Sequence, residues 1–491
     1  MTFEIVFVLL SLLGMMAALI ADKMRPGMVL FSVVVLFLCV GILTPKEMLE
    51  GFSNKGMITV ALLFLVSEGI RQSGTLGQVI KKLLPQGKTT VFKAQLRILP
   101  SVAFISAFLN NTPVVVIFAP IIKHWAKSVK LPATKFLIPL SYVTILGGIC
   151  TLIGTSTNLV VHGMILEAGY EGFTMFELGK VGIFIAIAGI IYLFIFSKRL
   201  LPDARPDTAV PDEEVEEGEK LHRVEAVLGA RFPGINKKLS DFNFQRHYGA
   251  EVKEIKTRNG QRYVDHLEDV VLREGDTLVV MADDTFIPTW GESSVFVLLT
   301  NGNDPDTSGK KKRWLALILL VLMIVGATVG ELPATKEMFP DIKLDMFFFV
   351  CITTIIMAWT NIFPARKYTK YISWDILITI ACAFAISKAM VNSGVADCVA
   401  GFIIGLSDDY GPHVLLAILF VITNNAAAAL AFPLALSISA QLGVSPTPFF
   451  VVICMAASAS FSTPIGYQTN LIVQGIGNYK FTDFVRIGLP L

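Results

Sequence analysis

Charged residues are scarce in this chain. Asp, Glu, Lys and Arg make up 16% of its 491 residues, whereas 54% are hydrophobic. Soluble domains carry about 25% charged residues, so this composition excludes an ordinary soluble protein. The net charge of +2 also gives no indication of nucleic-acid binding. We therefore expect an α-helical, polytopic membrane protein.

Several common motifs are absent as well. No C-x-x-C pair occurs among the six cysteines, so these are expected to be core residues without a disulfide or metal role. No nucleophile–base set, zinc spacing or phosphate loop indicates an enzyme. The first apolar run, 3–20, has no basic segment before it and is predicted to be a transmembrane helix rather than a signal peptide.

The apolar segments and the basic loops together predict the topology. Apolar segments span 3–20, 27–43, 57–72, 135–168, 179–197, 314–330, 344–363, 374–390 and 447–476. Loops rich in Lys and Arg alternate with acidic or neutral loops between them. The positive-inside rule then predicts a multi-pass protein of the plasma (inner) membrane, with its amino terminus outside and the block 198–313 in the cytoplasm.

Two further apolar stretches, 94–126 and 412–443, are interrupted by polar residues. Basic residues flank the first stretch at both ends, and a single spanning helix there would invert the topology of every later segment. We therefore expect a re-entrant hairpin whose tip lies near Asn110 and Asn111 and faces protein or a watery cavity. The second stretch is predicted to form a matching hairpin.

The two halves of the chain resemble each other. Three pairs of segments agree in order and spacing: "SGTLGQV" at 73–79 with "SGVADCV" at 393–399, "FLNNTPVVV" at 108–116 with "ITNNAAAAL" at 422–430, and "GTSTNLVV" at 154–161 with "GYQTNLIV" at 466–473. The first copy, 1–200, crosses the membrane an odd number of times, so the second copy, 314–491, should be inverted. Inverted repeats with broken helices are typical of secondary transporters.

The second copy is expected to be shorter than the first. After "GTSTNL" the first copy continues with a further full helix, whereas after "GYQTNL" the second reaches "FTDFVRIGLPL" and stops. We therefore expect that a last transmembrane helix of about 20 residues is missing from this chain.

Each copy carries two polar loci, a hairpin tip and a broken helix. Helix N-termini at such breaks offer N–H donors to an anion, and exposed carbonyl oxygens can coordinate a hard cation such as Na+. The alternative is that these side chains only cap helices and join them to one another. The candidate anion-binding residues are Asn110, Asn111, Thr112, Thr157, Asn158, Asn424, Asn425, Thr469 and Asn470.

A polar insertion, 201–313, separates the two copies. Residues 203–219 are acidic and contain proline, which predicts a disordered linker. A small α/β cytoplasmic domain at about 222–286 follows, with strand-like alternation in "GAEVKEIKT" and "DTLVVMAD". The end of this domain, "VVLREGDTLVVMA", resembles a TrkA-C domain.

The hairpin "NNT", the broken-helix "GTSTN" and their second copies together resemble the divalent anion:sodium symporter (DASS) family of the ion transporter superfamily. The insertion resembles the branch often linked with sulfate. In that family a Ser-Asn-Thr triplet at each hairpin tip contacts the substrate. Asn111, Thr112 and Asn425 match the triplets, while Asn110 and Asn424 replace Ser and Ala426 replaces Thr.

The resemblance also implies sodium ligands and an assembly. Family members usually work as homodimers that move a transport domain like an elevator past a scaffold. The positions that resemble sodium-site residues are Ser106, Asn110, Asn111, Gly154, Thr423, Asn425 and Gly466.

The sequence thus predicts a secondary active transporter that is not an enzyme and needs no cofactor besides Na+ as coupling ion. The leading hypothesis is sodium-coupled symport of a small divalent anion, with sulfate as first candidate, because Ala426 removes a donor that dicarboxylate carriers use. Three alternatives stay open: a dicarboxylate carrier, an arsenite-type or Na+/H+ exchanger, and a membrane anion sensor. The exchanger would need a membrane carboxylate such as Glu68, which is equivalent to Lys388 in the repeat.

Overall fold

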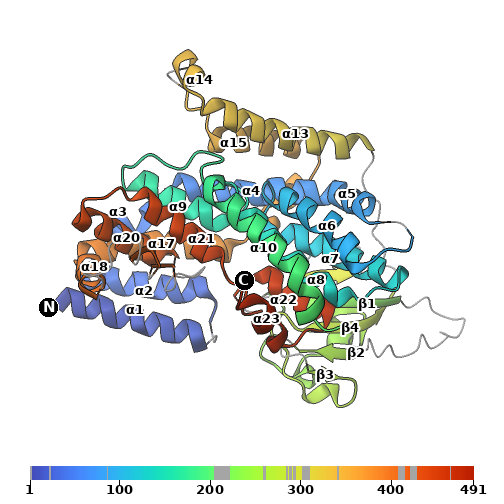
Figure 1. Ribbon diagram of the computed structural model, residues 1–491. Coiled ribbons are helices and arrows are strands. Elements are labelled where there is room, and N and C mark those ends of the chain that lie inside the picture. Colours follow the sequence, from blue (N-terminus) through green and yellow to red (C-terminus); the bar gives the residue numbers. More distant parts are fainter. Residues whose placement is uncertain are drawn as a thin grey trace, which may run out of the picture. The chain divides into compact units, whose positions relative to one another are not determined.

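The computed structural model is mainly helical and contains one small sheet (Figure 1). The described residues are 3–21, 24–85, 87–203, 222–229, 231–257, 261–283, 286, 290, 295–300, 310–339, 342–406, 415–417, 419–420, 428–464 and 466–491. This architecture agrees with the predicted helical membrane protein that carries a small domain with strands. Contacts between residues divide the chain into two compact units.

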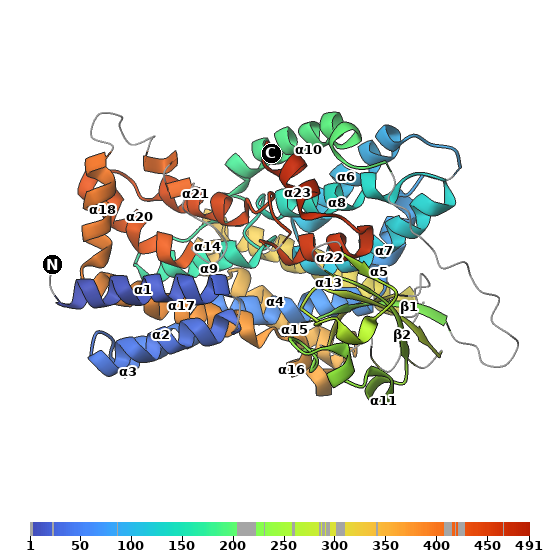
Figure 2. The same cartoon turned by 90° about the horizontal axis from the view of Figure 1, so that it is seen from below.

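Unit 1 consists of Met1–Ser67, Ile149–Gly182 and Ile318–Ser460. Its helices are α1 (Phe3–Ala21), α2 (Pro26–Val40), α3 (Pro45–Glu50), η1 (Gly51–Ser53), the beginning of α4 (Lys55–Gln72), α9 (Ser156–Glu167), the first residues of α10 (Gly179–Leu200), most of α13 (Lys310–Gly330), α14 (Pro333–Met338), α15 (Met346–Trp359), η5 (Ala365–Lys367), α16 (Tyr368–Tyr371), α17 (Trp374–Asn392), α18 (Val395–Leu406), α20 (Ala428–Leu442) and α21 (Thr447–Ser458). Helix α17 is central in this unit, because it packs against α2, α3 and α20 (Figure 2).

Unit 2 consists of Glu68–Gly148, Ile183–Leu317 and Phe461–Leu491. It contains the end of α4, α5 (Thr75–Leu83), α6 (Val91–Ser106), α7 (Asn111–Ser128), η2 (Ala133–Lys135), α8 (Leu137–Gly148), most of α10, the start of α13, the sheet, α22 (Gln468–Gly477) and α23 (Phe481–Gly488). All twelve residues of α8 are buried, and this helix packs against α6, α7 and α22. Helix α22 lies beside α7 and α8 in both ribbon views (Figures 1 and 2).

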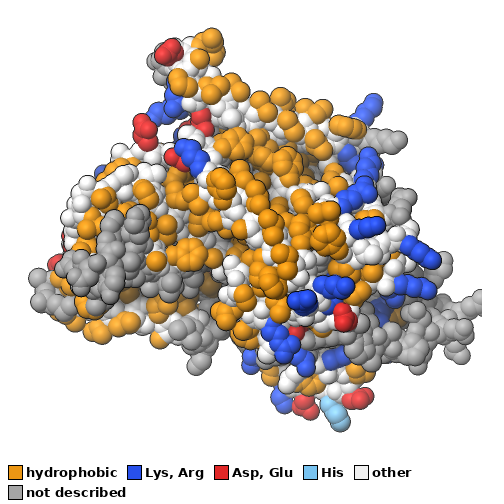
Figure 3. All heavy atoms as spheres, viewed as in Figure 1, with side chains coloured by type: hydrophobic (Ala, Val, Ile, Leu, Met, Phe, Trp, Pro, Cys, Tyr) orange, Lys and Arg blue, Asp and Glu red, His pale blue; other side chains and the backbone are white. Residues whose placement is uncertain are grey.

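Among the described residues, four helices are long and apolar enough to cross a membrane. They are Pro45–Gln72, Gly179–Leu200, Lys311–Gly330 and Trp374–Asn392. Hydrophobic side chains cover much of the visible helical surface, and Lys and Arg gather where α5 and the start of α13 lie in unit 2 (Figure 3). This separation of apolar and basic surface is the pattern expected of a protein embedded in a bilayer.

Local backbone conformations recur at equivalent places in the two halves. Gly74, after α4, and Gly394, after α17, both adopt a left-handed conformation with φ of 71° and 75°. Gly41 and Asn361 end α2 and α15 in the same way, with φ of 82° and 52°. These matches are consistent with the predicted repeat, while its inverted arrangement stays a prediction.

The sheet domain, by which we mean the described residues between 222 and 300, has five antiparallel strands in the order β3-β2-β4-β1-β5. The strands are β1 (His222–Leu228), β2 (Glu251–Lys256), β3 (Arg262–Tyr263), β4 (Thr277–Ala282) and β5 (Phe296–Thr300), with η3 (Leu239–Asp241), α11 (Phe244–Tyr248) and η4 (Leu267–Asp269) between them. The sheet continues past the predicted boundary at 286, because β5 pairs with β1. Whether the domain is of the TrkA-C type stays a prediction.

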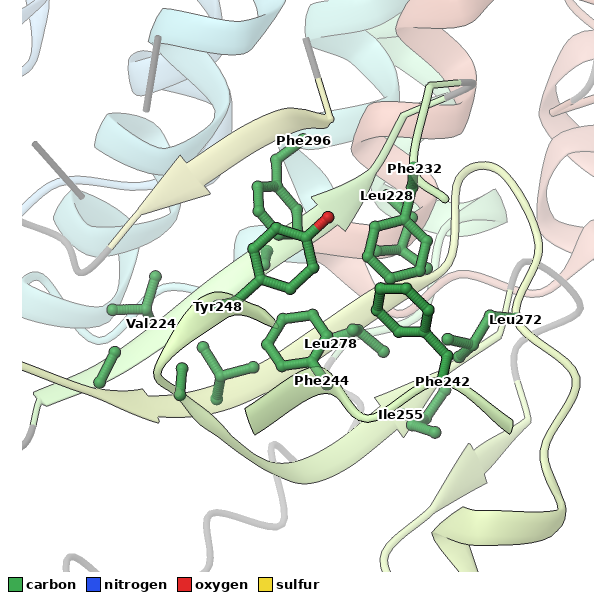
Figure 4. Packing of buried hydrophobic residues seen from close by; sticks show 14 of the residues in the cluster. Val224, Leu228, Phe232, Phe242, Phe244, Tyr248, Ile255, Leu272, Leu278 and Phe296 are labelled. Carbon is green, nitrogen blue, oxygen red and sulfur yellow. The ribbon is translucent and has the colours of Figure 1, made fainter. Parts of the chain in front are cut away.

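An aromatic core holds the sheet domain together (Figure 4). The ring of Phe232 lies 5.0 Å from that of Phe242 and 5.8 Å from that of Tyr248, measured between centroids. Phe244 and Phe296 complete the cluster against Tyr248. Rings at such distances add stabilisation to the burial of their apolar surface.

The sheet domain also contains buried charges. Glu254 accepts a hydrogen bond of 2.8 Å from Arg262, and the Lys256 ammonium lies 3.4 Å from a carboxylate oxygen of Glu225. Burial by itself raises the pKa of Glu225, but Lys123, Lys256 and Arg223 together lower it to about 2 from an ordinary value of 4.5. The ionised form of Glu225 therefore stabilises the folded protein.

This lowered pKa predicts how stability depends on pH. We expect Glu225→Gln to lower the free energy of unfolding at neutral pH by on the order of 3 kcal/mol. Because the folded-state pKa lies below the unfolded-state value, the contribution is present above about pH 4.5 and is lost as the pH falls toward 2. Unfolding midpoints of both proteins should converge over that range, and a difference that stays constant into acid would contradict the assignment.

A close contact between α6 and α8 generates a second prediction. A Cβ atom added at Gly147 would lie 2.1 Å from the carbonyl oxygen of Ala103, whereas at Gly14 it would meet nothing within 4 Å. We expect Gly147→Ala to lower the thermal midpoint, since overpacking costs about 1–3 kcal/mol. The control Gly14→Ala should be neutral or slightly stabilising, because alanine favours helix. Equal midpoints for the two variants would rule out the tight packing.

Candidate functional site

The predicted first hairpin consists of two helices separated by a short non-helical segment. Helix α6 ends at Ser106 and α7 begins at Asn111. Asn110 is the N-cap of α7, and Pro113, which has no N–H, occupies the first turn, where its missing donor costs no helical hydrogen bond. These residue types explain why the chain breaks here. That the break lies at membrane depth stays a prediction.

Hydrogen bonds connect this break to the N-terminus of α22. Ser106 Oγ donates to Asn111 Oδ1 over 2.8 Å, and Asn111 Nδ2 donates to the Tyr467 hydroxyl over 2.9 Å. Thr112 Oγ1 lies 3.3 Å from Gln468 Oε1, to which it donates. We call these five residues the hairpin cluster. Asn111 is 1% exposed and Ser106 is fully buried, whereas Thr112 is half-buried and Gln468 is exposed, so the cluster runs from the interior of unit 2 to its surface.

The broken helix before α22 is held by a second set of hydrogen bonds. Gly466 N donates to Thr463 Oγ1 over 3.1 Å, and Asn470 Nδ2 donates to the Thr463 carbonyl oxygen over the same distance. The Ser141 hydroxyl of α8 lies 2.8 Å from Thr469 Oγ1 and 2.6 Å from Asn470 Oδ1. Thr469 and Asn470, both predicted as anion ligands, thus connect α22 to α8 and to the loop before it.

The other broken helix, before α9 in unit 1, has the same local geometry. Asn158 Nδ2 donates to the Thr151 carbonyl oxygen over 2.9 Å, which is the same seven-residue separation as between Asn470 and Thr463. The N-cap residues Thr155 and Tyr467 have similar dihedral angles, with φ of −139° and −146° and ψ of 146° and 135°. In both copies the asparagine therefore ties the non-helical segment to the start of the next helix.

The structure brings together only part of the predicted site. Ser106, Asn111, Thr112, Gly466, Thr469 and Asn470 belong to unit 2, together with Asn110, whose side chain makes no capping hydrogen bond. Gly154, Thr157 and Asn158 belong to unit 1. Thr423, Asn424 and Asn425, with most of the predicted second hairpin's first half, lie outside the described residues.

Sequence reasoning missed four polar residues: Tyr467, Gln468, Thr463 and Ser141. The first two occupy the positions of Thr155 and Ser156 in the repeat, where a longer side chain can reach a neighbouring helix. The larger polar side chains at 467 and 468 were the feature of the sequence that could have indicated contacts to a neighbouring helix. Ser141 lies in an otherwise apolar, buried helix, and an isolated serine there indicates nothing by itself.

The hairpin cluster is polar but carries no charged side chain. Its members offer hydroxyl, phenol and carboxamide groups next to the N-termini of α7 and α22. Partial positive charge at helix N-termini favours an anion, and neutral oxygens suit a monovalent cation. Within the described ranges, no three His, Cys, Asp or Glu side chains are grouped so that they could hold a metal ion.

Glu68, the carboxylate considered for proton exchange, is paired. Arg71 donates to it over 2.6 and 2.7 Å, and Gln72 Nε2 donates over 2.6 Å. Lys388, at the equivalent position of the repeat, is exposed. The two residues therefore have different environments, and Glu68 is paired with neighbours on its own helix.

Interrupted helices whose breaks gather neutral polar side chains define a class of protein. Non-helical backbone within apolar segments is tolerated only where it is buried in protein or lines a cavity. Integral membrane transporters use such breaks to bind their ions and solutes. The fold and the hairpin cluster place this chain in that class.

Comparison with known proteins specifies the family. A model of the citrate transporter family (CitMHS) matches residues 16–423 and, in a second match, 341–491. The chain is 29% identical to an uncharacterized transporter of Synechocystis over 94% of this chain and 90% of that protein. It is 26% identical to an uncharacterized transporter of Escherichia coli over 99% of this chain and 96% of that protein. It is 32% identical to sodium/sulfate cotransporter 1 of Chlamydomonas reinhardtii over 55% of this chain and 31% of that protein.

The chain belongs to the citrate transporter (CitMHS) family of ion transporters. This confirms the relationship to divalent anion:sodium symporters that the hairpin and broken-helix motifs predict. The family and these relatives are transporters, which fits the prediction that the chain is not an enzyme.

The hairpin cluster yields a prediction that does not depend on the substrate. Asn111→Ala leaves the Ser106 and Tyr467 hydroxyls without this partner in a buried place, which should cost about 1–3 kcal/mol of unfolding free energy. Tyr467→Phe should cost less, and the double variant should be about 0.5–1.5 kcal/mol more stable than the sum of the two single effects indicates. Unfolding measured in lipid or detergent tests this cycle, and strictly additive effects would show that the two side chains do not interact.

Proposed function

We propose that this protein is a sodium-coupled symporter of a small divalent anion, with sulfate as the preferred substrate. The observation that carries the proposal is the hairpin cluster, where the N-termini of α7 and α22 are joined by neutral polar side chains. Relatives that are named sodium/sulfate cotransporters support the choice of ion and anion. Sulfate is small and doubly charged, so it matches a site of helix N-termini and uncharged donors.

The anion would bind at the two helix starts. Neither N-cap side chain accepts a hydrogen bond from its first turn within the described chain. First-turn N–H groups of α7 and α22 can therefore point to a bound anion. Thr112 is half-buried and Asn110 makes no capping bond, so their side chains are the ones best placed to turn toward a substrate.

Sodium would be held by oxygens of the same segment. The Ser106 hydroxyl and Asn111 Oδ1 lie 2.8 Å apart, so one ion could contact both oxygens after a small rotation of the hydroxyl. Gly154, Thr423, Asn425 and Gly466 are further candidate sodium ligands in our proposal, and they rest on the family resemblance alone. In this proposal Asn111 Oδ1 binds sodium, while Asn111 Nδ2 points toward Tyr467 at the start of α22, where the anion would bind. One side chain would therefore contribute to both binding sites.

The remaining features of the proposal follow the family resemblance. We infer alternating access by an elevator-type movement, and a homodimer as the working assembly. A carboxylate is the second candidate substrate, which the description of the matching family as citrate transporters favours. A site of neutral donors would accept either anion, and the experiment below separates them.

Uptake by proteoliposomes tests the proposal. Labelled sulfate should accumulate only with an inward Na+ gradient, and Asn111→Ala should abolish the uptake, because both ligands lose a contact. Gln245→Ala, which removes an exposed carboxamide from the sheet domain, is the control and should transport like the wild type.

Competition identifies the substrate. Excess unlabelled thiosulfate should block sulfate uptake, whereas succinate and citrate should not. Sodium-independent uptake, or full activity of Asn111→Ala, would overturn the proposal. Block by succinate or citrate, with uptake of the labelled carboxylate itself, would favour the second candidate. A wild type that binds sulfate without any flux would favour the anion sensor.

A further inference from the structure

The sheet domain contacts α7 and α22, two of the three helices that carry the hairpin cluster. Strand β1 contributes the first contact: the Lys123 ammonium of α7 lies 3.1 and 3.2 Å from the two carboxylate oxygens of Glu225. The side chains of the pair are 21% and 16% exposed, so the ion pair is largely shielded from water. Shielded pairs with two oxygen contacts hold their geometry far better than exposed ones.

The second contact joins the start of β4 to α22. A Cβ atom added at Gly475 would lie 2.4 Å from Thr277 Oγ1, and one added at Gly275 would lie 3.4 Å from Leu471 Cδ2. Thr277 is fully buried. Helix α22 therefore approaches the start of β4 so closely that a methyl group at position 475 would have to displace the Thr277 hydroxyl.

The two contacts are connected through the sheet itself. Strands β1 and β4 pair directly, with Val227 opposite Thr277 and Glu225 opposite Val279. At their other ends, α7 and α22 are joined by the bonds of Asn111 and Thr112 to Tyr467 and Gln468. The hairpin cluster thus connects α7 and α22 at their N-termini, and the sheet connects the same two helices nearer their C-termini. Lys123 follows Asn111 by twelve residues, or about 18 Å of helix.

Of the three basic residues that lower the pKa of Glu225, Lys123 comes from a helix. The others belong to the sheet domain itself: Lys256 lies 3.4 Å from Glu225, and Arg223 and Arg262 face Glu254. Strand β5 also lies against α7. Removal of the Lys123 ammonium therefore breaks the ion pair to α7 but leaves Glu225 paired within the sheet. This makes Lys123 a selective place to test the contact without unfolding the domain.

We propose that the sheet domain regulates the affinity of the hairpin cluster for anion and sodium by setting the spacing of α7 and α22. This inference rests on the proposed function for its ligands. A sheet held in place keeps the two helix N-termini at the distance that suits the anion, and a sheet that is shifted or released weakens binding. Any cytoplasmic partner or ligand that displaces the domain would then lower transport without touching the site.

The first experiment compares Lys123→Met with Lys253→Met in the full chain. Lys253 forms an exposed ion pair with Glu251 inside the same domain, so its variant is the matched control. We expect Lys123→Met to raise the KM for labelled sulfate at least about fivefold, the lower end of common coupling between sites, at unchanged amounts of folded protein. The control should keep the wild-type KM.

A second variant tests the other contact and guards against a local effect at Lys123. Gly475→Ala introduces a methyl group against the Thr277 hydroxyl and should also raise the KM. Combining it with Thr277→Ala removes that hydroxyl and should restore the KM toward the wild-type value. A purely structural defect of α22 would not be rescued from the sheet domain, so failure of the rescue counts against the inference.

Hydrogen exchange measured without any anion separates this inference from the proposed function. Lys123→Met and Gly475→Ala should accelerate amide exchange at 107–113 and 466–471, while Lys253→Met should not. If the wild type takes up no sulfate, the proposed function fails, and the exchange data still decide whether the sheet controls the cluster. Unchanged exchange in both variants, or an unchanged KM in an active transporter, would overturn the regulatory role.

Discussion

The structure depends on one constraint: a polar group inside an apolar chain must find a hydrogen-bond partner. An unpaired buried amide costs roughly 2–7 kcal/mol, and the break between α6 and α7 buries the Asn111 carboxamide almost completely. Ser106 and Tyr467 satisfy its two ends. The consequence is that the consecutive helices α6 and α7 must meet the start of α22 at this point, although Asn111 and Tyr467 are 356 residues apart in the sequence.

The same constraint explains why both broken helices look alike. Asn158 and Asn470 each donate to a carbonyl seven residues earlier, so each non-helical segment is closed by the first turn of the helix that follows. In transporters such a segment must hold a fixed conformation, and some of its backbone N–H and C=O groups must lack helical hydrogen bonds so that they can bind ions or solutes. The hairpin cluster forms such a segment with neutral side chains alone.

Much of this was predictable from the sequence, and the limits have physical reasons. The helix break at Asn110 and Asn111 follows from residue types that are costly in an apolar helix. The counterpart that the repeat predicts, at Asn424 and Asn425, lies outside the described residues. Tyr467 and Gln468 were not predicted as site residues, because a comparison of repeats gives the position of a residue but not which neighbours its side chain can contact. The Lys123–Glu225 pair joins residues 102 apart, and no local pattern reports a contact at that separation. Strand β5 was not predicted either, because its pairing with β1 also joins residues far apart in the sequence.

Equilibrium binding of labelled sulfate to the purified protein tests the central claim most directly, because it needs neither a gradient nor a competent transport cycle. The account predicts saturable binding that appears only with Na+, is absent when choline replaces it, and disappears in Asn111→Ala but persists in Gln245→Ala. Binding that is equally strong without Na+, or that survives the loss of the Asn111 carboxamide, would contradict the claim that this cluster joins anion and sodium.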